Sequence, residues 1–143
     1  MPIFKDFIKS TGVKKGDFGI EVTETAELNN LSLASLRLSS IKNLGVSIAL
    51  DDFGAGYSAL RYLKDLPIDL LKLDKSFTTE MAETHNQNLI QIAKLMADSL
   101  SMEFICEGLE EEWQIEKAIS LGCERGQGYF LHKPCSLEDL TNE

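Results

Sequence analysis

Two adjacent aspartates, Asp51 and Asp52, begin the run DDFGAGYS and are well placed for metal chemistry. They follow the apolar segment 45–50 (GVSIAL), which is typical of a buried parallel strand. Neighbouring carboxylates repel each other, so a fold that keeps both ionised needs positive charge nearby, and a divalent metal ion is the usual source. Taken alone, the run also fits an ordinary turn rich in aspartate and glycine.

Polar residues also lie at or near the ends of other apolar segments. These are Glu21 and Glu24 with segment 18–22 (FGIEV), Lys72 and Asp74 with 69–73 (DLLKL), Glu107 and Glu110 with 102–106 (MEFIC), and Gln127 in the weaker segment 126–130 (GQGYF). In parallel α/β folds the catalytic groups gather at the carboxyl ends of the strands, so the set favours one shared site. Each residue taken singly also fits a solvated strand end.

Segments with helical periodicity alternate with these strands. Helices are expected over residues 33–44, 58–64, 89–100 and 113–119, with Gly122 as a stop signal. The alternation predicts an α/β fold with about five parallel strands. A closed parallel barrel needs eight strands and typically about 250 residues. The 143 residues therefore predict either an open sheet or part of a barrel.

Composition excludes several classes of protein. The length and a hydrophobic content of 43% predict one globular domain. The sequence has no apolar run long enough for a membrane span, so none is expected. A net charge of -9 argues against binding to a nucleic-acid polymer, but it permits a small phosphorylated ligand held through metal ions.

The three cysteines, an odd number without metal-type spacing, predict reduced thiols and a cytoplasmic protein. Cys106 lies beside Glu107 and could be taken for a nucleophile. Its apolar strand favours packing in the core instead.

Four stretches, EVTE, DDFGAGYSALRYLKDLPIDLLKLDKSF, CEGLE and QGYFLHKP, resemble the EAL domain, the cyclic-di-GMP-specific phosphodiesterase module of bacteria. The resemblance runs from about residue 18 to residue 134 in the family's order and spacing. It implies a modified TIM barrel, of which this chain resembles the C-terminal half. On this basis residues 1–143 form a single partial domain, with a leading helix and loop at 1–16, βα units at 17–135 and a tail or helix start at 136–143.

The resemblance implies a metal-ligand role for the acids that match the family's motifs. Glu21, Asp51, Asp52 and Glu107 match ligands of two Mg²⁺ or Mn²⁺ ions, and Asp51 matches the bridging carboxylate. The EAL tripeptide and an asparagine-bearing strand, which supply further ligands in the family, are absent from this chain. The resemblance therefore implies a two-metal site that is incomplete here.

Other matched residues carry other implied roles. Lys72 matches the lysine that contacts the nucleophilic water, and Gln127 matches a residue that hydrogen-bonds near that water and the phosphate. Glu24 matches the acid that steadies the DDFG loop, and Glu110 is expected to be structural. The sequence departs from the family where Cys106 replaces a common alanine and Glu124 a common aspartate. His85 and His132 lie outside this set and are expected to be surface or packing residues.

The implied activity is two-metal hydrolysis of cyclic-di-GMP to linear pGpG. Because two family ligands are absent, we expect weak or no activity from this chain alone. The alternatives are a non-catalytic module that binds cyclic-di-GMP or a protein partner, and a structural remnant without ligand. An open half barrel should also self-associate, or dock to a separate N-terminal half or a sensor domain.

Overall fold

The computed structural model of the chain describes residues 2–12, 14, 16–23, 30–56 and 59–140. The elements are α1 (Pro2–Thr11), β1 (Gly19–Thr23), α2 (Leu31–Lys42), β2 (Ser47–Phe53), α3 (Ala59–Asp65), β3 (Leu70–Leu73), α4 (Lys75–Thr79), α5 (Thr84–Ser99), β4 (Glu103–Cys106), α6 (Glu112–Ser120), β5 (Arg125–Gly126) and α7 (Leu137–Leu140). Strands and helices alternate along most of the chain, which confirms the predicted α/β class.

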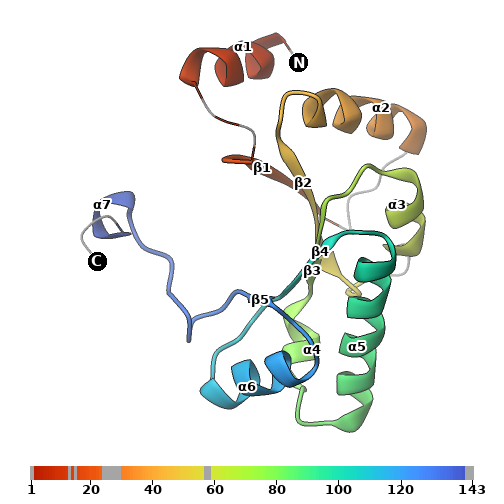
Figure 1. The fold of residues 1–143 in the computed structure, drawn as a ribbon, viewed down its shortest axis with the longest axis vertical. Helices are drawn as coiled ribbons and strands as arrows, with labels where there is room; N and C mark the ends of the chain where they lie inside the picture. Colours follow the sequence, from red (N-terminus) through yellow and green to blue (C-terminus); the bar gives the residue numbers. More distant parts are fainter. Residues whose placement is uncertain (1, 13, 15, 24–29, 57–58, 141–143) are drawn as a thin grey trace.

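The five strands form one parallel sheet in the order β1-β2-β3-β4-β5, so each strand pairs with the next one along the chain. Helices α2, α3 and α5 lie on the same side of this curved sheet (Figure 1). Parallel strands that pair in sequential order and are joined by helices are the arrangement of a (β/α) barrel. The prediction of about five strands of such a barrel is confirmed.

The core lies between the sheet and the helices that cover it. Strand residues Leu50, Leu71 and Leu73 are almost fully buried, and they belong to one apolar cluster with Ile90 and Ala97 of α5. Burial of each large aliphatic side chain contributes roughly 1.5–3 kcal/mol. This packing makes the strands a rigid base for the polar residues at their carboxyl ends.

Strand β2 is longer than expected at its carboxyl end. It runs to Phe53, so Asp51 and Asp52 lie within its last part instead of in the loop beyond it. The pairing of β2 with β3 shifts register between Leu50 and Phe53, which marks an irregularity at the two aspartates. The site is therefore built on a bulged strand end.

The last strand is shorter than the expected segment 126–130, because the chain turns directly after Gly126. Gly128 lies against the backbone of Leu109, so closely that an added Cβ would be 2.1 Å from the Leu109 carbonyl oxygen. The Phe130 amide donates to that same oxygen at 3.1 Å, and the Leu131 amide donates to the Gly128 carbonyl. These contacts bend the chain away from the sheet.

Two helices differ from the expectation. Helix α5 begins at Thr84, before the predicted residue 89. The prediction missed its first turn because that turn is polar and carries no apolar periodicity. The short helix α4 was not predicted, and Asp74 caps it by accepting a hydrogen bond from the Ser76 amide at 3.0 Å. Every helix in the described ranges is too short or too polar to traverse a lipid bilayer.

Candidate active site

Lys72 of β3 is the centre of a group of charged side chains at the carboxyl ends of the strands. Its ammonium nitrogen lies 2.8 Å from Glu21 Oε1, 2.9 Å from Asp51 Oδ1 and 2.7 Å from Glu107 Oε1. Burial alone would lower the pKa of Lys72, but the hydrogen bonds to Glu107, Glu21 and Asp51 outweigh it and raise that pKa. Lys72 is therefore a fixed positive charge shared by acids that lie in or directly after three other strands of the sheet, β1, β2 and β4.

The two aspartates of β2 reach the same site through an unusual backbone. Successive side chains of a regular strand point to opposite faces of the sheet. Here the register shift coincides with a left-handed conformation at Asp52, which has a φ of 56°. Aspartate tolerates this conformation better than most residues. The irregular backbone lets both carboxylates serve one cluster.

Three carboxylates meet closely enough to share a cation. One oxygen each from Asp51, Asp52 and Glu107 lies within 4.8 Å of the others. Hard divalent ions such as Mg²⁺ and Mn²⁺ prefer oxygen ligands of this kind. Glu21 is joined to the cluster through the Lys72 ammonium and remains more exposed than the other acids. The donor set therefore fits the expected metals.

Two of the clustered acids have pKa values above those of ordinary carboxyl groups. Burial, followed by the charge of Asp51, raises the pKa of Asp52. Burial also raises the pKa of Glu107, although Lys72 opposes the effect. In both acids the lowering effect of the Lys72 ammonium is smaller than the combined raising effects of burial and neighbouring carboxylates.

Buried polar residues behind Glu107, which the sequence reasoning missed, hold its backbone. The Thr78 hydroxyl oxygen lies 2.5 Å from the Glu107 carbonyl oxygen and 2.9 Å from that of Lys75, and its single proton can serve either. Gln114 donates to the Thr78 carbonyl at 3.0 Å and accepts from the Glu110 and Glu111 amides. A capping-box spacing from Glu111 to Gln114 was a signal for Gln114, but nothing in the sequence singled out Thr78.

Gly108 allows the chain to pass close to α4 just after Glu107. Its φ is 68°, and an added Cβ would lie 2.6 Å from the Lys75 Cβ and 3.0 Å from the Thr78 hydroxyl oxygen. Only glycine combines this backbone conformation with such a close approach. The position of Glu107 thus depends on how closely Gly108 packs against Lys75 and Thr78 of α4.

A pocket of about 460 Å³ opens beside the cluster. Glu107 and Gln127 both line it, together with Lys75, Tyr129 and His132. Gln127 therefore shares this pocket with Glu107, and it lies at the start of the turn that follows β5. His132 is exposed, as expected, yet it borders this pocket.

The structure thus brings together most of the residues singled out in the sequence. Glu21, Asp51, Asp52, Lys72 and Glu107 form one cluster, and Gln127 lines a pocket together with Glu107. Glu24, expected to steady the DDFG loop, lies outside the described residues. Glu110 is exposed at the pocket, and its backbone is held by Gln114.

The sequence profile of the EAL domain matches residues 1–134 of the chain. The signaling protein YkoW of Bacillus subtilis (strain 168) is 37% identical over 142 residues, which cover 98% of this chain and 18% of YkoW. The cyclic di-GMP phosphodiesterase PdeA of Borreliella burgdorferi is 35% identical over 136 residues, which cover 92% of this chain and 20% of PdeA. The chain spans about a fifth of the length of these curated relatives.

Solved structures agree with the sequence relatives. The crystal structure of the EAL domain of Mycobacterium smegmatis DcpA has a TM-score of 0.93 and 31% identity, and the match covers 97% of this chain and 63% of that one. The manganese/cy-diGMP complex of Klebsiella pneumoniae BlrP1 has a TM-score of 0.86 and 26% identity, covering 94% of this chain and 34% of that one. EAL domains are TIM-barrel-like, and the sequential parallel strands of this chain agree with that architecture. The chain belongs to the EAL domain family.

Proposed function

We propose that this chain is a module of an EAL-type cyclic-di-GMP phosphodiesterase, which hydrolyses the cyclic dinucleotide to linear pGpG at a two-metal site. The observation that carries the proposal is the meeting of Asp51, Asp52 and Glu107 within 4.8 Å, beside a pocket large enough to admit part of a nucleotide. The relative PdeA is named as a cyclic di-GMP phosphodiesterase, and the BlrP1 structure holds manganese and the dinucleotide. Both agree with the chemistry of this site.

The proposal assigns Asp51, Asp52, Glu107 and Glu21 as the ligands of Mg²⁺ or Mn²⁺. Divalent ions bound there would stabilise charge on the phosphate and lower the pKa of an attacking water. Lys72 contributes a fixed positive charge next to the negative charge that develops during displacement. Gln127 can donate an amide hydrogen bond to a phosphate oxygen from the wall of the pocket. Glu24 is assigned, from the family motif alone, to support of the DDFG loop.

The proposal includes weak or no turnover by these 143 residues alone. The sequence has no EAL tripeptide, and the matched DcpA chain is covered only to 63%. Fewer protein ligands leave part of the metal coordination to water. The second candidate, a non-catalytic module that binds cyclic-di-GMP or a protein partner, is favoured by this same incomplete match.

Manganese binding to matched variants tests the metal assignment. We expect calorimetry to show Mn²⁺ binding to the chain, and Asp51→Asn to weaken it at least about tenfold. Glu103→Gln is the control, because it also removes one carboxylate but lies at the amino end of β4, paired with Arg125. Equal loss of affinity in the two variants, or no binding by the parent chain, would contradict the assignment.

Turnover of cyclic-di-GMP separates the two candidate functions. Slow, Mn²⁺-dependent release of pGpG that disappears in Asp51→Asn supports the phosphodiesterase. Binding of the dinucleotide without any turnover supports the non-catalytic module. Rates equal to those of an intact EAL domain would refute the proposed weakness of this chain.

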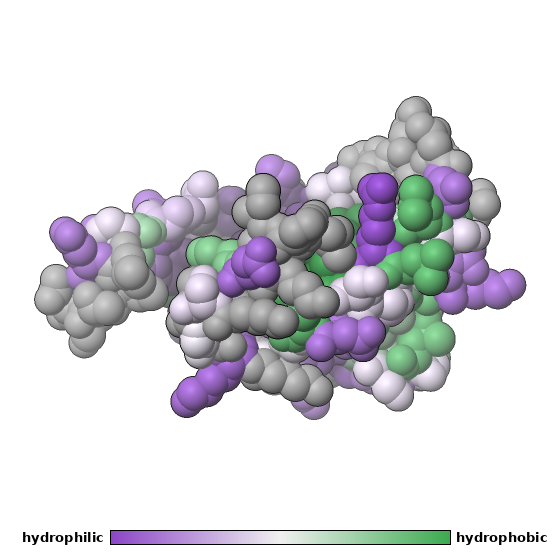
Figure 2. All heavy atoms as spheres, turned by 90° about the horizontal axis from the view of Figure 1, so that it is seen from above, coloured by the Kyte–Doolittle hydropathy of each residue, from purple (hydrophilic) through white to green (hydrophobic). Residues whose placement is uncertain are grey.

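The proposal also includes a partner for the open sheet, either a second copy, a separate N-terminal half or a sensor domain. Among the described residues, β1 and β5 each pair with one neighbouring strand, so both edges offer backbone groups for pairing. Leu36 of α2 and Leu60 of α3 are exposed. Hydrophobic residues reach the surface among hydrophilic ones on the face seen from above (Figure 2). Sedimentation is expected to show association, and a compact monomer at micromolar concentration would count against it.

A further inference from the structure

Two cysteines meet inside the molecule, outside the set of residues assigned to the metal site. The sulfur of Cys106, the last residue of β4, lies 3.1 Å from the sulfur of Cys123, which follows α6. Both side chains are buried, and the third cysteine, Cys135, is exposed. The expected core packing of Cys106 is confirmed, and its neighbour in the core is a second thiol.

The contact is close to the geometry of a disulfide. A disulfide bond is about 2.05 Å long, so the two sulfurs need to approach by only about 1 Å. They are 17 residues apart in the chain and are brought together by the packing of α6 against the sheet. The fold therefore holds the two sulfurs near bonding distance.

Cys123 is the sulfur that an incoming reagent can reach. It lines a pocket of about 160 Å³ whose wall is largely apolar and includes Leu109, Ile115 and Leu131. Cys106 is fully buried, whereas Cys123 retains 6% exposure. A small peroxide fits this pocket, and it would meet Cys123 before Cys106.

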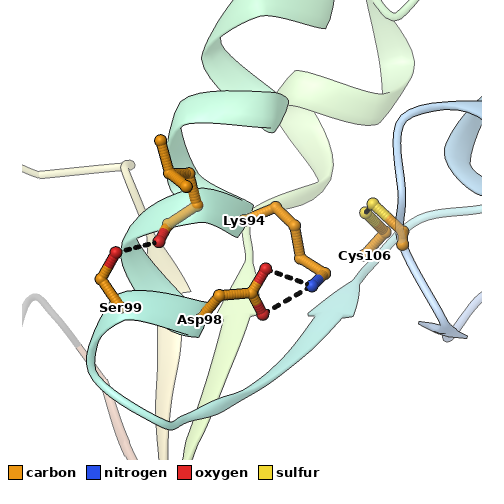
Figure 3. Close-up of polar contacts among 6 residues, drawn as sticks. Lys94, Asp98, Ser99 and Cys106 are labelled. Carbon is orange, nitrogen blue, oxygen red and sulfur yellow. Dashed lines mark hydrogen bonds and ion pairs between the residues drawn. The ribbon is translucent and has the colours of Figure 1, made fainter.

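The surrounding charges favour the same cysteine. The hydrogen bond from Cys106, aided by the charge of Lys94, lowers the pKa of Cys123, although burial opposes the change. Lys94 of α5 is held by Asp98 at 2.6 and 2.7 Å, on the part of the helix that lies near Cys106 (Figure 3). A nearby cation makes a thiol a better nucleophile.

We infer that Cys106 and Cys123 form a thiol pair that a hydroperoxide converts into an intrachain disulfide. The Cys123 sulfur attacks the peroxide and breaks the O–O bond, which yields a sulfenic acid on Cys123 and releases an alcohol, or water from hydrogen peroxide. The Cys106 sulfur then attacks the Cys123 sulfur, forms the S–S bond and expels the hydroxyl, which leaves as water with the Cys106 proton. The two thiols lose two electrons and the peroxide gains two.

The disulfide would also constrain two residues outside the core, Glu107 and Gln127. Cys106 directly precedes Glu107, and its carbonyl accepts a hydrogen bond from the Gln127 amide at 2.9 Å. The disulfide would therefore join the strand that carries Glu107 to the segment that leads to Gln127. Its formation does not depend on the proposed phosphodiesterase activity.

Peptide mapping after oxidation tests the inference. Cys135→Ser is the parent for the test, because it removes the exposed thiol and keeps the buried pair. Trypsin cleaves after Lys117 and so separates residues 95–117, with Cys106, from residues 118–125, with Cys123. After treatment of the folded protein with hydrogen peroxide or tert-butyl hydroperoxide, we expect these two peptides to be joined and then separated by dithiothreitol. Absence of the joined peptide from folded, oxidised protein would overturn the inference.

Two further variants check the order of the steps. In Cys106→Ala with Cys135→Ser, dimedone should trap a sulfenic acid on Cys123. In Cys123→Ser with Cys135→Ser, Cys106 should remain largely unreacted. A dimedone adduct on Cys106 alone would overturn the assignment of Cys123 as the attacking sulfur. If either variant fails to fold by circular dichroism, the joined peptide from the parent remains decisive, because the parent keeps both thiols.

Discussion

The ammonium nitrogen of Lys72 lies 2.7 Å from Oε1 of Glu107; Lys72 is in β3, and Glu107 directly follows the neighbouring parallel strand β4. Lys72 is opposite Ile105 in the register of β3 and β4, so Glu107 lies two residues further toward the carboxyl end. The lysine side chain therefore extends along the sheet to the edge where the acids gather. Since the same ammonium also serves Glu21 and Asp51, the cluster keeps an excess of negative charge that a divalent ion can balance.

Replacement of Lys72 by methionine should leave the clustered carboxylates without a compensating positive charge. We expect Lys72→Met to lower the free energy of unfolding by about 2 kcal/mol, between the values for surface and fully buried ion pairs. Addition of Mn²⁺ should then raise the melting temperature more than it does for the parent chain, because the ion replaces the lost charge. Lys42→Met, which breaks a half-exposed pair with Asp69, is the control and should cost about 1 kcal/mol or less. Equal responses to Mn²⁺ in parent and Lys72→Met would contradict this account.

Manganese itself should stabilise the folded chain. A ligand that binds only the folded state adds about 2.7 kcal/mol at a concentration one hundred times its dissociation constant. Thermal unfolding with increasing MnCl₂ should therefore show a rising midpoint, and excess EDTA should reverse the rise. KCl at matched ionic strength is the control for screening. A midpoint that follows ionic strength alone would argue against a specific cation site.

Thr78 should influence the proposed metal site through the backbone of Glu107, without being a metal ligand itself. We expect Thr78→Val, which keeps the shape of the side chain, to cost about 1–3 kcal/mol, because it leaves a buried carbonyl without its donor. Mn²⁺ affinity should fall as well, since the Glu107 backbone is less firmly held. Thr78→Ser retains the hydroxyl and should restore the affinity for Mn²⁺. Chemical denaturation and calorimetry measure the two effects, and unchanged affinity in Thr78→Val would show a purely structural role.

Gly108 and Gly122 form a matched pair for the close approach beside Glu107. Both have a positive φ, but an added Cβ meets Lys75 at Gly108 and nothing within 4 Å at Gly122. Gly122→Ala should therefore cost only the conformational strain of about 1–2 kcal/mol. Gly108→Ala should cost more, and it should weaken Mn²⁺ binding by displacing Glu107. Equal free energies of unfolding in the two variants would mean that the contact with Lys75 relaxes freely.

The sequence by itself determined the α/β class, the parallel strands and the location of the acids at strand ends. Apolar runs, helical periodicity and the order of segments are local properties, and they do not require knowledge of which residues touch. The strand boundaries predicted from the sequence are least accurate where contacts between distant segments determine where a strand ends. Leu109 bends the chain after β5, and the bulge extends β2 through Asp51 and Asp52.

Only the tertiary structure decided which side chains meet. The sharing of Lys72 among Glu21, Asp51 and Glu107 depends on the register of neighbouring strands, and the support of Glu107 by Thr78 depends on how α4 packs. Likewise, the spacing of the cysteines in the sequence does not indicate a pair, and it is the packing of α6 that places Cys123 against Cys106. The physical reason is common to all three contacts. Each joins segments far apart in the sequence, and their distance is set by core packing rather than by local preference.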